Sequence, residues 1–160
     1  MSNSCVITNE EGWYKKALDT DLARPKFAIM NPEITYTLPD YQTQCGCADI
    51  MMHTMERYFV LEDTMEITDK IAQDVMKNVM KYAKILKKDP ENYEARAEIM
   101  WCGSLSHNGL TGCGTCGGDW ATHLIEHELG GMFDVAHGAG LAAVWGSWAR
   151  YVTVSYTHLR

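Results

Sequence analysis

The 160-residue sequence contains no run of about eighteen apolar residues, so we expect no membrane-spanning segment and no membrane partner. Its first residues have neither a basic start nor an apolar stretch, and we therefore expect no signal peptide. Basic residues are also few, since 14 lysines and arginines stand against 21 aspartates and glutamates. Because phosphate binding requires a basic surface, the net charge of −7 argues against a nucleic acid partner.

Six cysteines are present, and two pairs have spacings that can chelate a metal ion. Cys45-Gly-Cys47 and Cys113-Gly-Thr-Cys116 together leave open a four-thiolate zinc site. Without a secretory signal, however, reduced thiols in a cytoplasmic protein are the favoured interpretation. We therefore expect free cysteines and a cytoplasmic location.

The first 38 residues differ in pattern from the rest of the chain. Residues 5–8 and 26–30 are short β-like runs, and residues 33–38 alternate with many β-branched side chains. Two or three short strands cannot bury a face by themselves. We therefore expect these segments to be the edge of a larger sheet.

From residue 39 onward the sequence predicts a mainly α-helical body. Apolar side chains recur at intervals of three and four residues, and Asn108-Gly109 and the glycine-rich residues 111–118 predict a loop. The last residues, 154–160, do not continue the helical pattern. We interpret them as a non-native tail, in which His158 has no functional role. The helices expected are residues 40–60, 63–86, 91–107, 119–133 and 138–151.

Five residues in this helical body form a candidate metal site. Asp49 and His53 are four residues apart, as are His123 and His127, and this spacing places each pair on one helix face. His137 follows ten residues later, next to a glycine where the chain can fold back. A lone histidine is more often a core residue, so the argument rests on the combination. Three imidazoles with one carboxylate suit Zn²⁺ or Fe²⁺.

Two other motifs are less complete. His123-Leu-Ile-Glu126-His127 matches the His-x-x-Glu-His pattern of inverzincin metalloproteases, in which the glutamate is the base. No glutamate and only Asp134 among aspartates follow Glu128, so the further acidic ligand is missing. Gly112-Cys-Gly-Thr-Cys-Gly117 fits a dinucleotide fingerprint, but it follows a helix and no strand comes after it, so we interpret it as a loop.

The segments around these metal-ligating residues resemble the iron-containing alcohol dehydrogenase family, in its NADH-dependent butanol dehydrogenase branch. The first is Cys45-Gly-Cys-Ala-Asp49-Ile-Met-Met-His53, and the second runs from Trp120 through His123 and His127 to His137-Gly-Ala-Gly. The resemblance implies the helical, metal-binding C-terminal domain of the dehydroquinate synthase-like fold. On this basis residues 1–38 are the last strands of a truncated nucleotide-binding α/β domain, residues 39–153 an incomplete helical catalytic domain, and 154–160 the tail.

The resemblance also implies roles for individual residues. Asp49, His53, His123 and His137 would bind Fe²⁺ (or Zn²⁺), and His127 would be a catalytic, non-ligand histidine facing the substrate. The complete enzyme would use NAD(P)H, act on a small aldehyde or alcohol and form a homodimer. The family's nucleotide-binding fingerprint is missing from this sequence, so we expect the chain to be inactive alone. A non-enzymatic metal-binding helical module is the remaining alternative.

Overall fold

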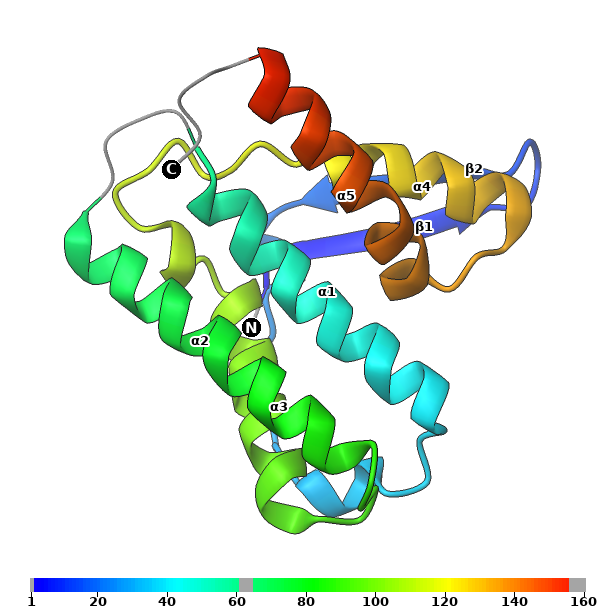
Figure 1. Cartoon of the computed structure of the whole chain (residues 1–160). Helices are drawn as coiled ribbons and strands as arrows, with labels where there is room; N and C mark the ends of the chain where they lie inside the picture. The colour runs from blue at the N-terminus through cyan, green and yellow to red at the C-terminus, as the bar shows by residue number, and fades with distance from the viewer. Residues whose placement is uncertain (1, 61–64, 156–160) are drawn as a thin grey trace.

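The computed structural model describes residues 2–60 and 65–155, and most of them lie in helices (Figure 1). The mainly α-helical body expected from the sequence is confirmed. In chain order the strands and α-helices are β1 (Ser4–Asn9), β2 (Tyr14–Asp19), α1 (Asp40–Tyr58), α2 (Glu66–Leu86), α3 (Tyr93–His107), α4 (Ala121–Phe133) and α5 (His137–Ser155). Three short 3-10 helices are η1 (Asp21–Ala23), η2 (Pro32–Thr35) and η3 (Leu110–Gly112).

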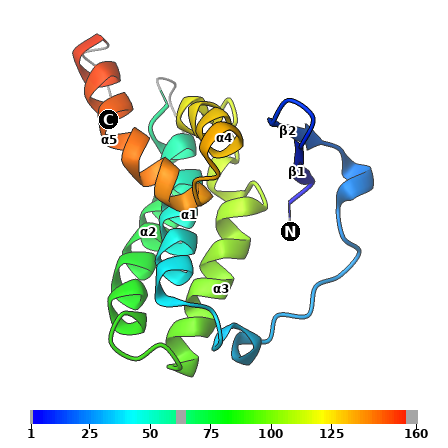
Figure 2. The same ribbon diagram turned by 90° about the vertical axis from the view of Figure 1, so that its right-hand side faces the viewer.

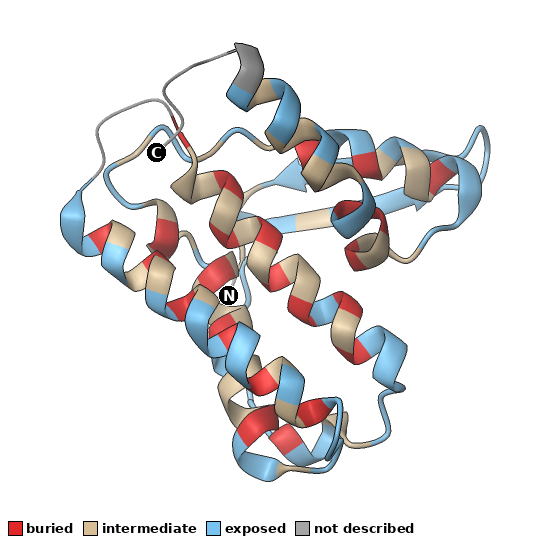
Figure 3. Cartoon of the chain, viewed as in Figure 1, coloured by how far each residue is buried: buried red, intermediate tan, exposed pale blue. Residues whose placement is uncertain are grey.

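The core lies between α1, α2 and α3. Ala72, Val75 and Val79 on α2 form a stripe at helical spacing, and all three are buried. Val75 and Val79 pack with Cys47 and Ile50 of α1. Buried positions therefore face inward along each of these helices, while their outer faces are exposed (Figure 3).

The N-terminal residues form an antiparallel hairpin of β1 and β2, in which Ser4 pairs with Asp19. The turn between them places Gly12 and Trp13 at φ values of 88° and 56°. The hairpin lies beside α4 and away from α2, and residues 20–39 run back along the molecule to α1 (Figure 2). Trp13 and Lys15 pack against Gly131 of α4, which leaves no room for a larger residue there.

Two sequence-based expectations for the N-terminal region are wrong. Residues 26–30 form no strand, and residues 33–38 contain the 3-10 helix η2 in place of an extended run. Asn31 caps η2 by accepting a hydrogen bond from the Glu33 N–H, and Pro32 suits the first helical position. The side chains of Phe27 and Ile29 are 76% and 83% exposed, so no neighbouring described element covers them. The strand Tyr14–Asp19 was not predicted.

The helix boundaries are close to those expected. α5 is helical to Ser155, two residues into the segment interpreted as a tail. Residues 156–160, including His158, lie outside the described part of the chain, as do the residues at which the second helix was expected to begin. Within the described residues, no helix combines the length and apolar character needed to cross a membrane.

Candidate metal centre

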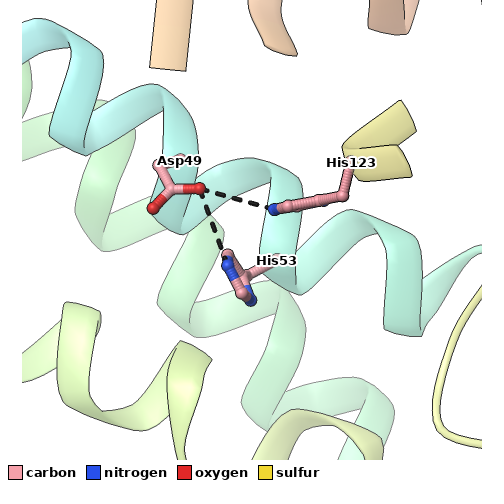
Figure 4. A group of neighbouring side chains, drawn as sticks. All are labelled: Asp49, His53 and His123. Atoms are coloured by element: carbon pink, nitrogen blue, oxygen red, sulfur yellow. Dashed lines mark ion pairs between the residues drawn. The ribbon is translucent and has the colours of Figure 1, made fainter. Parts of the chain in front are cut away.

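The four predicted metal ligands meet around one carboxylate oxygen of Asp49. Oδ1 of Asp49 lies 3.6 Å from Nε2 of His53, 3.5 Å from Nε2 of His123 and 3.4 Å from Nε2 of His137. Asp49 and His53 come from successive turns of α1, and His123 reaches them from α4 (Figure 4). His137 begins α5, which packs against both α1 and α4. Residues far apart in the sequence thus share one site.

The donor atoms of this site fit a divalent metal ion. Oδ1 of Asp49 and Nε2 of His123 are buried and have no hydrogen-bond partner, which is costly unless another group satisfies them. Two ligands about 2.1 Å from one ion at tetrahedral angles would lie about 3.4 Å apart. The separations from Oδ1 of Asp49 to the three imidazole nitrogens match this value. Among the four residues, only the donor atoms of Asp49, His53 and His123 all lie within 4.8 Å of one another. Imidazole nitrogen and carboxylate oxygen are ligands that Fe²⁺ and Zn²⁺ accept.

Two buried glutamates hold the outer nitrogens of the ligand imidazoles. Nδ1 of His123 contacts Oε2 of Glu56, and Nδ1 of His137 contacts Oε2 of Glu126. Both carboxylates are completely buried. A carboxylate at Nδ1 keeps the proton there and leaves the Nε2 lone pair free for a metal ion. Neither glutamate was singled out for this role from the sequence.

Glu56 has a second role at the N-terminus of α4. Trp120 precedes this helix in a left-handed conformation, with φ 61°, and its side chain caps nothing. Oε1 of Glu56 instead accepts hydrogen bonds from the backbone N–H groups of Thr122, at 2.8 Å, and His123, at 3.4 Å. A carboxylate at a helix N-terminus satisfies free donors and interacts favourably with the helix dipole. One side chain of α1 therefore fixes both the helix and its histidine.

We expect Glu56→Gln to separate these two roles. The glutamine oxygen can still accept from Thr122 and His123, but its amide group faces Nδ1 of His123 with a second donor, so the imidazole loses its orientation. Metal affinity should fall about 10- to 100-fold, as for other partners of metal-binding histidines. Chelator competition measures the affinity. Glu56→Leu removes both roles, so its melting temperature should fall further than that of Glu56→Gln. Equal metal affinity in Glu56→Gln and the unmodified chain would contradict this assignment.

Glu126 is held between the hairpin and α5. Nζ of Lys15 lies 3.5 Å from its Oε2. A Cβ on Gly140 would lie 2.7 Å from Cγ of Glu126, so only glycine lets α5 pass this close to the carboxylate. Lys15 of β2 and the predicted ligand His137 of α5 are consequently joined through one buried carboxylate.

α5 approaches α1 closely at the start of the helix. A Cβ built on Gly138 would lie 1.9 Å from the carbonyl oxygen of Cys45 and 2.5 Å from its carbonyl carbon. Both are backbone atoms that cannot rotate away. Only glycine permits this contact, which places His137 beside Asp49.

The charges of the site shift the pKa values of its residues. Burial raises the pKa of Asp49, but contacts with His107, His123 and His137 outweigh burial and hold it well below its usual range. Burial lowers the pKa of His123, but Asp49 and Glu56 outweigh it and raise this pKa to about 9. Burial and the neighbouring imidazole of His107 lower the pKa of His53 to about 2. The carboxylate is therefore ionised and His53 is neutral, as metal ligation requires, whereas a metal ion that binds His123 must displace a proton from its imidazole.

Comparison with known proteins identifies the family of this chain. The model of the Fe-containing alcohol dehydrogenase family, C-terminal, matches residues 43–157, which include all four predicted ligands. The chain belongs to the iron-containing alcohol dehydrogenase family.

Individual relatives agree with this membership. NADH-dependent butanol dehydrogenase A of Clostridium acetobutylicum is 40% identical over 152 residues, which cover 95% of this chain and 39% of that protein. The NADPH-dependent aldehyde reductase YqhD of Escherichia coli is 36% identical over 139 residues, 87% of this chain and 36% of that protein. The crystal structure of NADH-dependent butanol dehydrogenase A from Thermotoga maritima superposes with a TM-score of 0.94 at 38% identity, covering 98% of this chain and 39% of that one. The chain thus spans about two fifths of the length of these relatives.

The alternative metal sites considered from the sequence are not supported. Two groups of metal-ligating side chains come together among the described residues, Asp49-His53-His123 and Glu126-His127-His137, and neither contains a cysteine. Cys45 and Cys47 are buried whereas Cys113 and Cys116 are exposed, and all four are free thiols, so the four-thiolate zinc site is not formed. Glu126 is fully buried and engaged by His137 and Lys15, so it cannot act as the exposed base of a metalloprotease.

A cavity of about 620 Å³ lies beside the metal centre. Its lining includes His127 of α4, Trp120 just before that helix, and the hairpin residues Val6 and Ala17. The His127 ring lies 5.5 Å from that of His137 and 6.4 Å from that of His123, and it is not among the atoms around Asp49 Oδ1. This position suits a residue that contacts substrate, and the catalytic role of His127 stays a prediction of the family resemblance.

The structure adds one histidine that the sequence analysis left out of the site. Nε2 of His107, the last residue of α3, lies 3.3 Å from Oδ2 of Asp49. No short spacing links His107 to any of the predicted ligands, so periodicity gives no signal for it. Only the packing of α3 on α1 brings the two side chains together.

Proposed function

We propose that this chain supplies the metal-binding part of the active site of an alcohol dehydrogenase or aldehyde reductase that moves a hydride between NAD(P)H and a small aldehyde. The observation that carries the proposal is the convergence of three Nε2 atoms on one unpartnered carboxylate oxygen beside a cavity. The names of the relatives support butanol-sized alcohols and aldehydes as substrates. The family supports iron, and we retain Zn²⁺ as the alternative ion.

The chain's own residues would bind and orient the substrate. A bound Fe²⁺ or Zn²⁺ would supply Lewis-acid polarisation of the substrate oxygen. His127 faces the cavity, and burial together with the charges of His137 and Lys15 lowers its pKa, so it is neutral near pH 7. The neutral imidazole can accept the proton of the alcohol, and the imidazolium so formed can return it to the developing alcohol oxygen in the reverse direction. Trp120, with Arg57 stacked 4.5 Å above its ring, would close one wall of the cavity to water.

The domain assignment belongs to the same proposal. Residues 1–38 would end the nucleotide-binding domain, residues 39–153 would form the helical catalytic domain, and residues 154–160 would be a non-native tail. A homodimer and a cytoplasmic location, without nucleic acid or membrane partners, complete the proposal. The six free cysteines support the cytoplasmic location, and the net charge of −7 argues against a nucleic acid partner. The homodimer rests on the family resemblance alone.

A segment exchange tests the proposed activity. Residues 43–153 would replace the matching segment of the Thermotoga maritima butanol dehydrogenase, which keeps that enzyme's nucleotide-binding domain and last helices. We expect Fe²⁺-dependent oxidation of NADH by butanal in the chimera and no detectable turnover by the 160-residue chain alone. A chimera that folds and binds Fe²⁺ and NADH but never reduces an aldehyde would refute the enzymatic proposal and favour a metal-binding module.

In the same chimera we expect His127→Phe to lower kcat by about 10²- to 10⁴-fold, the usual contribution of a positioned acid–base group. Metal content should stay at one ion per chain because His127 is outside the ligand set. Metal analysis and steady-state kinetics measure the two effects. A parallel loss of metal would instead make His127 a ligand.

A further inference from the structure

The second oxygen of Asp49 also has a defined partner. Oδ1 of this carboxylate faces the three imidazoles, while Oδ2 lies 3.3 Å from Nε2 of His107. The Asp49 and His107 side chains are 23% and 30% exposed, so this contact is largely shielded from water. The two oxygens of one carboxylate therefore have different environments.

The His107 ring is held in place by α3 and by a ligand histidine. Its Nδ1 lies 2.7 Å from Oγ of Ser106, a fully buried residue, and 2.9 Å from the carbonyl oxygen of Gly103. The ring also stacks on His53, with centroids 3.7 Å apart and planes tilted by 33°. A carboxylate oxygen only accepts hydrogen bonds, so the contact with Oδ2 of Asp49 requires the ring proton on Nε2. Nδ1 then accepts from the Ser106 hydroxyl and makes no hydrogen bond to the Gly103 carbonyl.

A carboxylate can bind a metal ion through one oxygen or through both. A hydrogen bond from Nε2–H occupies Oδ2 and leaves Oδ1 as the only oxygen directed at the ion. We propose that His107 is a positioning residue that keeps Asp49 a single-oxygen ligand and, through stacking, fixes the plane of His53. The inference rests on the proposed metal site but not on the catalytic activity.

Cobalt binding tests this inference, because Co²⁺ takes the ligands of Fe²⁺ and Zn²⁺ and its visible absorption weakens as coordination number rises. We expect His107→Leu to weaken Co²⁺ binding by about 10- to 100-fold in a chelator competition. The visible absorption bands of Co²⁺ bound to this variant should also lose intensity. Asp49 is then free to bind the ion through both oxygens, which raises the coordination number. His107→Gln, whose amide N–H can reach the same oxygen, should restore most of the affinity and the spectrum.

Two further variants separate positioning from folding. Ser106→Ala keeps the His107 ring but removes the donor to Nδ1, and we expect a smaller loss of affinity, about twofold to tenfold. This variant carries the test if His107→Leu does not fold, and unchanged Co²⁺ affinity in it would then count against the proposal. Trp101→Leu, at an exposed position of the same helix, should bind Co²⁺ as the unmodified chain does.

The outcomes distinguish this inference from the proposed function. Unmodified chain that binds no Co²⁺ would overturn the metal site and this inference with it. Normal affinity and spectrum in a folded His107→Leu would overturn the role of His107 alone. Equal losses in His107→Leu and His107→Gln would show that the ring acts only by filling space, which also contradicts a hydrogen-bonding role.

Discussion

Gly138→Ala is expected to detach the start of α5 from α1. The added methyl group would lie 1.9 Å from the Cys45 carbonyl oxygen, and neither backbone can yield without moving a whole helix. Overpacking of this kind costs about 1–3 kcal/mol where side chains can rearrange, so we expect at least about 3 kcal/mol here. For a chain of this length, that lowers the melting temperature by roughly 10 °C. Metal affinity should fall too, because His137 adjoins this residue.

Gly146→Ala on the same helix is the matched control. A Cβ at this position would meet only Nη1 of Arg150, at 3.8 Å, which is ordinary contact. Alanine at an open helical position is expected to stabilise by about 0.5–1 kcal/mol. The melting temperatures of the two variants should therefore shift in opposite directions. A Gly138→Ala variant as stable as the unmodified chain would show that the helix contact is looser than the structure indicates.

The second large effect is expected from His53→Ala, which removes one of the four metal-directed groups. Metal binding at a four-ligand site contributes about 10–16 kcal/mol, so each ligand accounts for about 3 kcal/mol, or about 100-fold in affinity. Removing His53 disturbs the fewest other contacts, because its Nδ1 has no hydrogen-bond partner. No buried glutamate therefore loses its imidazole partner in this variant. Removing His123 would leave Glu56 buried without its imidazole.

His127→Ala is the control for this experiment, since His127 lies four residues from His123 on the same helix but outside the ligand set. Titration with Fe²⁺ or Co²⁺ under anaerobic conditions measures both variants. We expect near-normal affinity in His127→Ala and a loss of about 100-fold or more in His53→Ala. The opposite ranking would mean that His127 and not His53 completes the site.

The sequence predicts those parts of the molecule that depend on local periodicity. The α2 stripe through Val75 and Val79 defines a helix without any knowledge of its partners. The four-residue spacing of Asp49 and His53 likewise places both on one face of α1. By contrast, the only local indication for His137 is the glycine beside it, where the chain can fold back, and this does not say which residue it meets. The family resemblance supplied that expectation, and the contact depends on Gly138.

The elements that the sequence did not predict depend on distant partners. β2 contains adjacent Lys15 and Lys16, which interrupt the alternation that marks a strand, and only pairing with β1 makes it extended. Glu56 and Glu126 look like ordinary solvent-facing charges, because a buried carboxylate differs from an exposed one only in what packs around it. His107 was not predicted to be part of the site for the same reason, since its partner Asp49 lies on another helix.

The ligand set also has a mechanical consequence. Asp49 and His53 lie on α1, which packs against α2, α3 and α5. His123 lies within α4, and His137 begins α5. An ion held by all four would connect helices that are far apart in the sequence, and it would stabilise the folded chain because the unfolded chain lacks the assembled site. The metal would thus hold α4 and α5, and with them the hairpin that contacts Glu126 through Lys15, against α1 of the helical core.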